Sequence, residues 1–134
     1  NNLQMPFMEE GGAVLLKKNK KRIYATTDKK YLKVAKIIIV CIGTPVKNSK
    51  PDLAFFFKMF IEVKEYLDPN KLLIIRSSIY PGTCLKIQKF LGKKFKNIAY
   101  CPERVLPGNI LQELVTNDRV VGGLTIDCAI KAKR

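Results

Sequence analysis

Three short segments of this sequence carry small, hydroxylated or charged residues directly after apolar runs. A hydroxyl or a free backbone amide can hydrogen-bond a phosphate or a ribose, and a carboxylate can accept a proton from water. The segments are Gly43-Thr44-Pro45, Ser77-Ser78 and Glu103-Arg104. They predict a binding or catalytic site wherever the fold brings them together.

Each segment also has a simpler interpretation, which the residues alone leave open. Gly43-Thr44-Pro45 is also typical of a chain that leaves a strand for a loop. The hydroxyls of Ser77 and Ser78 can cap a following helix instead of binding a ligand. Glu103 can be a general base for water, or it can form an ion pair beside Arg104.

The apolar runs before these segments predict the strands that position them. Lys36–Ile42 is a continuous, mainly β-branched run, which predicts a central strand buried on both faces. Leu72–Ile75 and Ile98–Cys101 predict two further strands. Shorter strands are expected at Ile23–Thr26 and, at one edge of the sheet, at Val120–Gly123.

Helices are predicted between the strands. Apolar residues with a period of about 3.6 predict a helix that begins after Asp52 as its N-cap and ends at Leu67. A second helix is expected over Cys84–Leu91, with Gly92 at its C-terminal end. Glu9–Asn19 predicts a short amphipathic helix, and Thr125 is expected to cap a last one.

Strands and helices that alternate with short connections predict a parallel sheet with right-handed crossovers. The expected fold class is therefore α/β, a partial Rossmann-like doubly wound parallel sheet. Ligands of such sheets bind outside the carboxyl ends of the strands. The three polar segments should therefore share one rim of the sheet.

The formal net charge of +14 raises nucleic acid as a partner, and the densest basic run is Lys17–Arg22. Lysine predominates over arginine, and aromatic residues do not alternate with the charges, which favours a solvated basic face. We therefore expect no nucleic-acid partner. Retention on DNA that weakens steeply with salt would support the alternative, a non-catalytic basic binding module. No apolar run approaches the roughly 20 residues that cross a bilayer, so no membrane is expected.

The four cysteines do not have the spacing of a metal site or a redox motif. Cys41, Cys84, Cys101 and Cys128 contain no C-x-x-C pair, and the sequence has no histidine to complete a zinc site. We interpret them as structural thiols in a reducing cytoplasm. Cys41 and Cys101 lie in apolar runs and are expected to behave as small hydrophobic residues.

Several blocks of the sequence, taken in order, match the motifs of one enzyme family. The blocks are Ile39–Pro45, Lys50–Leu53, Arg76–Thr83, Ile98–Gly108 and Asn117–Gly123. At this spacing they resemble the nucleotide-sugar 6-dehydrogenases, the family of UDP-glucose and GDP-mannose dehydrogenases. The resemblance spans nearly the whole chain, so it is more specific than a single short motif.

This resemblance implies an NAD-dependent enzyme that oxidises the C6 alcohol of a UDP-sugar to an acid. The family uses two NAD molecules in succession, works through a cysteine-bound thiohemiacetal and thioester, and forms homo-oligomers. The resemblance implies cofactor contacts at Gly43, Thr44, Pro45, Ser77 and Ser78. It also implies catalytic roles for Ser78, beside the reacting centre, and for Glu103, on the hydrolytic water. It implies substrate contacts at Arg104, Val105 and Leu106.

Parts of the family's machinery are not found in this sequence. No G-x-G-x-x-G follows a predicted strand, so the loop that holds the pyrophosphate is missing. The family's catalytic cysteine and lysine lie in later domains, and none of the four cysteines matches the catalytic motif. We therefore expect residues 1–134 to form a partial N-terminal NAD-binding domain that lacks its first β-α-β segment.

The chain by itself is accordingly expected to be inactive, because it supplies no nucleophile for the covalent steps. Mixing it with NAD and UDP-sugars should produce no reduced cofactor, measured by absorbance. Turnover by the purified chain would contradict this expectation.

Overall fold

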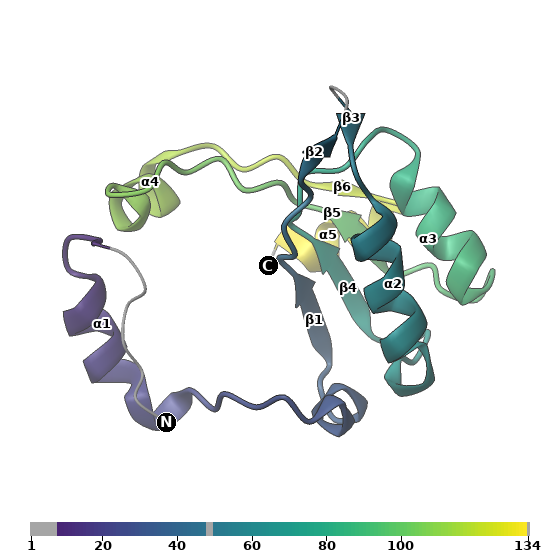
Figure 1. The fold of residues 1–134 in the computed structure, drawn as a ribbon, viewed down its shortest axis with the longest axis horizontal. Helices are drawn as coiled ribbons and strands as arrows, with labels where there is room; N and C mark the ends of the chain where they lie inside the picture. Colours follow the sequence, from purple (N-terminus) through teal and green to yellow (C-terminus); the bar gives the residue numbers. More distant parts are fainter. Residues whose placement is uncertain (1–7, 48–49, 134) are drawn as a thin grey trace. The chain divides into compact units, whose positions relative to one another are not determined.

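The computed structural model describes residues 8–47 and 50–133, which fall into two compact units (Figure 1). The first unit takes in the chain up to Thr27 together with Arg104–Arg119, and the second takes in Asp28–Glu103 together with Val120–Arg134. The second unit contains a four-stranded sheet. Its strands, in spatial order, are β1 (Ile37–Val40), β4 (Leu72–Ile75), β5 (Ile98–Tyr100) and β6 (Gly122–Gly123).

The prediction of three parallel strands is confirmed, since β1, β4 and β5 run parallel to one another. The strand β6 pairs antiparallel with β5, so the sheet is mostly rather than wholly parallel. A Cβ atom on Gly123 would lie 2.6 Å from the backbone of both Thr125 and Ala129. Glycine is needed at this position because the edge strand lies directly against the helix that follows it.

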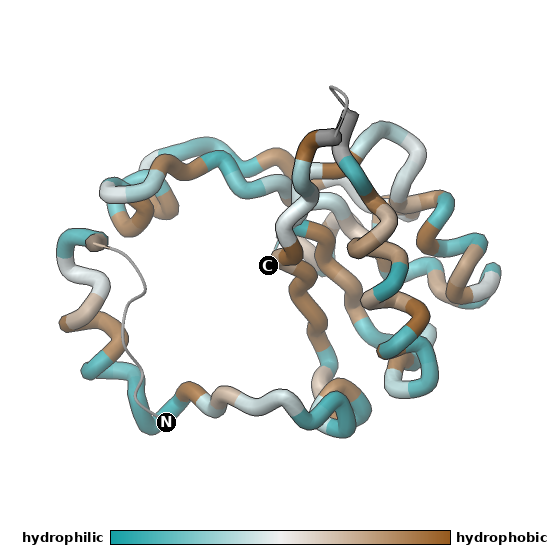
Figure 2. Tube along the Cα trace, viewed as in Figure 1, coloured by the Kyte–Doolittle hydropathy of each residue, from teal (hydrophilic) through white to brown (hydrophobic). Residues whose placement is uncertain are grey.

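Helices lie on both faces of the sheet, so the described residues form an α/β fold with a mostly parallel sheet, while the doubly wound strand order stays a prediction (Figure 1). On one face, alternate strand residues pack against α2 (Ala54–Val63) and α3 (Thr83–Leu91). On the other face, Leu72 and Ala99 pack against Cys128 of α5 (Ile126–Lys133). The hydrophobic stretches of the tube in Figure 2 follow these strands and recur along the helices.

The prediction that the first strand is buried on both faces is wrong. Ile37 and Ile39 are each 55% exposed, whereas Val40 is buried. β1 is an edge strand among the described residues, and α5 contacts β4, β5 and β6. The β-branched run therefore predicted a strand correctly, but within the second unit α5 packs on the neighbouring strands and leaves the second face of β1 exposed.

The helix ends follow the predicted signals closely. Leu53 rather than the predicted Asp52 occupies the N-cap position of α2, although a carboxylate oxygen of Asp52 accepts the backbone N–H of Ala54 at 2.9 Å. A 3-10 turn, η3 (Lys64–Tyr66), continues α2 to the predicted end. Gly92 ends α3 with a φ of 119°, and its N–H donates to the carbonyl of Gln88. No helix in the described part of the chain is long and apolar enough to cross a membrane.

The remaining elements lie outside the sheet and were predicted less well. Residues 23–26 form no strand, so that prediction is wrong, while Thr125 caps α5 by accepting the N–H of Cys128. The helix α4 and the β2–β3 hairpin were not predicted, and residues 48–49 of the predicted turn lie outside the described residues. The elements outside the four-stranded sheet and its covering helices are α1 (Gly12–Asn19), η1 (Lys20–Arg22), η2 (Lys29–Lys33), β2 (Val46–Lys47), β3 (Lys50–Pro51) and α4 (Ile110–Thr116).

The core on the α2 face should tolerate little loss of volume. Phe60 is 1% exposed and packs edge-on against Phe56 at 5.3 Å between ring centroids. We expect Phe60→Ala to lower the free energy of unfolding by about 3–5 kcal/mol, measured by urea denaturation. Phe55→Ala is the matched control, because Phe55 is on the same helix but 62% exposed. Its effect should stay within about 0.5 kcal/mol, and equal losses in the two variants would contradict the observed packing.

Candidate functional site

The parallel register places the ends of β1 and β4 at the same level. Val40 lies opposite Ile75, and the next residues of both strands enter loops at this edge. The loops enclose a hollow of about 320 Å³, near the lower limit of about 300 Å³ for ligand pockets. It is lined by Cys41, Ile42, Gly43, Thr44, Arg76, Ser77, Ser78 and Glu103. Thr44, Ser78 and Glu103 thus line one hollow, as the topology predicted.

Backbone hydrogen bonds join the two strand ends beneath this hollow. The carbonyl of Val40 accepts the N–H of Arg76 at 2.9 Å and the N–H of Ser77 at 3.2 Å. The hydroxyl of Ser77 donates to the same carbonyl at 3.4 Å, and Ser77 is buried. Ser77 therefore uses its hydroxyl to hold the strand ends together.

A side-chain hydrogen bond joins the loops themselves. The hydroxyl of Thr44 donates to the carbonyl of Ser78 at 2.8 Å, while the side chain of Ser78 is exposed. A Cβ atom on Gly43 would meet nothing within 4 Å, so a ligand has room to approach the backbone there. Pro45 is exposed and is not among the residues that line the hollow.

Glu103 forms an ion pair with Arg76, a residue to which the sequence analysis assigned no role. The side chains of Arg76 and Glu103 are 20% and 40% exposed, so the pair lies at the rim rather than in the core. The position of Arg76, directly after a buried strand, was the signal that could have identified it. The pair gives the rim a carboxylate whose charge is compensated and whose orientation is restrained.

The predicted substrate residues Arg104, Val105 and Leu106 belong to the other compact unit. Leu106 is 68% exposed, and its backbone N–H donates to the carboxylate of Glu113 at 2.9 Å. Their role as substrate contacts stays a prediction.

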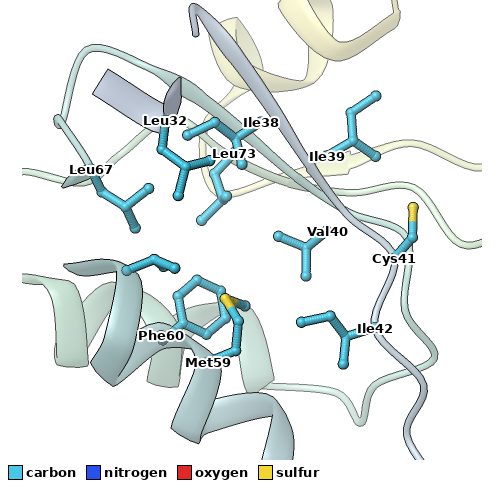
Figure 3. Close-up of a pocket in the computed structure, with 11 residues that line it drawn as sticks. Leu32, Ile38, Ile39, Val40, Cys41, Ile42, Met59, Phe60, Leu67 and Leu73 are labelled. Atoms are coloured by element: carbon cyan, nitrogen blue, oxygen red, sulfur yellow. The ribbon is translucent and has the colours of Figure 1, made fainter. Parts of the chain in front are cut away.

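A second hollow, of about 220 Å³, lies between β1 and α2 (Figure 3). It is lined by Leu32, Ile38, Ile39, Val40, Cys41, Ile42, Met59, Phe60, Val63, Leu67 and Leu73. These side chains offer no hydroxyl, amide or charged group, whereas ligand sites combine apolar walls with a few polar groups that fix orientation. The polar hollow at the strand ends is therefore the better candidate.

The cysteines differ from one another in exposure. Cys101 and Cys128 are buried, as small hydrophobic residues should be, but Cys41 is exposed, which corrects the expectation that it behaves as a small hydrophobic residue. Cys41 comes directly after the last residue of β1, the edge strand of the described sheet. Burial raises the pKa of the Cys84 thiol to about 11 and also raises the pKa values of Cys101 and Cys128.

The structure adds no binding or catalytic evidence for the basic run or for a metal site in the described residues. All cations of the basic run Lys17–Arg22 are exposed, as either interpretation of that run requires. No group of three or more acidic or cysteine side chains in the described residues could hold a metal ion.

Comparison with known proteins identifies the class to which this fold and site belong. The family description "UDP-glucose/GDP-mannose dehydrogenase family, NAD binding domain" matches residues 1–134. The chain therefore belongs to the UDP-glucose/GDP-mannose dehydrogenase family, in the region of its NAD-binding domain.

Several individual relatives are named UDP-N-acetyl-D-mannosamine dehydrogenases. The chain is 46% identical, over 104 residues, to UDP-N-acetyl-D-mannosamine dehydrogenase of Methanocaldococcus jannaschii, covering 74% of this chain and 24% of that protein. The structure of a UDP-D-ManNAc dehydrogenase from Pyrococcus horikoshii aligns with a TM-score of 0.86 and 31% identity, covering 96% of this chain and 33% of that chain. The UDP-N-acetyl-mannosamine dehydrogenase from Staphylococcus aureus aligns with a TM-score of 0.82 and 26% identity, over 98% of this chain and 34% of that one. This chain thus spans only a quarter to a third of the length of these relatives.

The exposure of the cysteines predicts their order of alkylation, since the thiolate is the reactive form. Iodoacetamide at neutral pH should modify Cys41 first. Because the pKa of Cys84 is about 11, its rate should rise about tenfold per pH unit until near pH 11. Peptide mapping by mass spectrometry measures the order of modification and the pH dependence of the Cys84 rate. Unfolded chain is the control, in which all four should react alike, and modification of Cys128 as fast as that of Cys41 would contradict the structure.

Proposed function

We propose that this chain carries part of the cofactor site of an NAD-dependent dehydrogenase that oxidises the C6 alcohol of UDP-N-acetyl-D-mannosamine to the uronic acid. One observation carries the proposal: three parallel strands bring Thr44, Ser78 and Glu103 around one polar hollow. Family membership and the relatives that bear this activity in their names support the choice of reaction.

The residues at the hollow fit a dinucleotide. The open space above Gly43 allows close approach to the backbone, and the exposed hydroxyl of Ser78 is available as a donor or acceptor. We assign cofactor contacts to Gly43, Thr44, Pro45 and Ser78, with Ser77 contributing by holding the turn from beneath. NAD, when bound, supplies the acceptor for the hydride that leaves C6.

Glu103 is proposed to act on the water that hydrolyses the acyl intermediate. Its carboxylate lies at the rim of the hollow, where it can accept a proton from water. Arg76 compensates the charge of that carboxylate and restrains its orientation. We also propose that Ser78 lies near the reacting centre. The nucleophile for the covalent steps has to come from outside these residues.

The sugar nucleotide is proposed to contact Arg104, Val105 and Leu106, of which Leu106 is largely exposed. UDP-glucose and UDP-N-acetylglucosamine are the alternative substrates within the family, and a comparison of kcat/KM for the three sugars distinguishes them. We further propose that the protein acts as a homo-oligomer in the cytoplasm, and that residues 1–134 form part of one NAD-binding domain. The four free cysteines are compatible with a reducing compartment.

The hydrogen bond between the two loops provides a test of the cofactor assignment. Thr44→Val keeps the shape of the side chain but removes the donor to the Ser78 carbonyl. We expect the affinity of the chain for NAD, measured by isothermal titration calorimetry, to fall roughly three- to tenfold. Thr27→Val makes the same change at an exposed residue that lines neither hollow, and it should leave the affinity unchanged. Absence of NAD binding by the unaltered chain would remove the cofactor assignment.

The role of Glu103 is tested separately in an enzyme that includes the catalytic cysteine. Glu103→Gln should lower turnover by roughly 100- to 10,000-fold, as expected for loss of a general base, and should leave NAD affinity within about twofold. Full turnover in this variant would show that the carboxylate serves only the ion pair with Arg76.

A further inference from the structure

Two carboxylates hold the backbone of the segment that begins at Arg104. Glu9 comes from the N-terminal part of the first unit, and Glu113 comes from α4. Between them they accept the backbone N–H groups of Leu106, Gly108 and Leu111. Three amides within six residues are thus satisfied by glutamates rather than by secondary structure.

Glu9 is the more informative of the two because it is distant in sequence. Its Oε2 atom accepts the N–H of Gly108 at 2.9 Å, across 99 residues, and its Oε1 atom accepts the N–H of Leu111 at 3.1 Å. Both oxygens of one half-buried carboxylate are therefore engaged by a single segment. Hydrogen bonds to an ionised acceptor are about twice as strong as those between neutral groups.

The backbone of Gly108 is in the left-handed region, with a φ of 95°, which glycine adopts readily. Gly11, just after Glu9, is also left-handed, and a Cβ atom there would lie 3.4 Å from Leu111 Cδ1. The two glycines thus let the chain turn where the carboxylate meets the amides. Glu9 is fixed on one side by the start of α1 and holds the start of α4 on the other.

Glu113 completes the restraint from within the segment's own helix. Its Oε2 atom accepts the N–H of Leu106 at 2.9 Å, and Asn117 donates to the carbonyl of Arg104 at 3.3 Å. The side chain of Leu106 is nevertheless 68% exposed. A large apolar side chain on a firmly held backbone is the arrangement expected of a preorganised binding segment.

We propose that Glu9 is a positioning residue that holds Arg104–Leu106 in the conformation that binds the sugar nucleotide. The inference rests on the function proposed above, which makes Arg104–Leu106 the substrate segment. Both described hydrogen bonds of the Glu9 carboxylate go to the protein backbone, so its effect on the substrate is transmitted through Gly108 and Leu111.

The test compares Glu9→Gln with Glu10→Gln in the full chain. Glutamine has one acceptor oxygen, so at position 9 one of the two amides must lose its partner. Glu10 is adjacent and exposed, which makes it a matched control for the loss of one charge. Amide hydrogen exchange at Gly108 and Leu111, followed by NMR, should accelerate about tenfold or more in Glu9→Gln only.

Ligand titrations followed by NMR separate positioning from a general loss of structure. Shifts of the Arg104–Leu106 amides on addition of UDP-N-acetyl-D-mannosamine should require about tenfold more ligand in Glu9→Gln. Shifts at Thr44 and Ser78 on addition of NAD should be unchanged, because the hydrogen bonds of the Glu9 carboxylate go to Gly108 and Leu111 within its own unit. Glu113→Ala, which removes the acceptor of the Leu106 amide, should weaken binding of the sugar nucleotide in the same selective way.

The possible outcomes distinguish failure of the positioning role of Glu9 from failure of the substrate role proposed for Arg104–Leu106. If the unaltered chain binds the sugar nucleotide and Glu9→Gln binds it equally well, the positioning role is wrong even when exchange accelerates. Equal loss of NAD and sugar-nucleotide binding would also overturn it, since that indicates a structural role. If the unaltered chain shows no shifts at Arg104–Leu106, the substrate assignment of the proposed function fails first.

Discussion

The candidate site depends on the carbonyl oxygen of Val40. This atom accepts hydrogen bonds from two backbone amides and one hydroxyl at the end of β4, so two parallel strands enter their loops at the same level. The hydroxyl of Thr44 then joins those loops through the carbonyl of Ser78. Because backbone atoms make most of these contacts, the spacing of the hollow is set by strand register rather than by side-chain choice.

Carboxylates serve two different purposes in the two units. Glu103 pairs with Arg76 at the open rim of the hollow, where a carboxylate remains accessible to water. Glu9 and Glu113 instead use their oxygens on backbone amides of the segment after Arg104. The first arrangement leaves a group available for proton transfer, and the second fixes the loop that leads into α4.

Hydrophobic periodicity predicted the strands and the main helices because it reports which residues seek burial. It was wrong where burial depends on a neighbour: Ile39 and Cys41 lie in an apolar run and are exposed at the edge of the sheet. Residues 23–26 have strand-forming composition and form no strand. The helix α4 was not predicted, and one of its N-terminal amides, that of Leu111, is satisfied by a glutamate about a hundred residues earlier.

The order of residues along the chain was sufficient to predict a shared rim, because each polar segment directly follows a strand and parallel strands end on the same edge. Packing decided which polar groups remain available: Ser77 is buried against Val40, while Ser78 is exposed beside it. Long-range contacts also chose the partners of Glu103 and Glu9. Local pattern cannot encode such pairs, since they depend on how distant segments are brought together when the core forms.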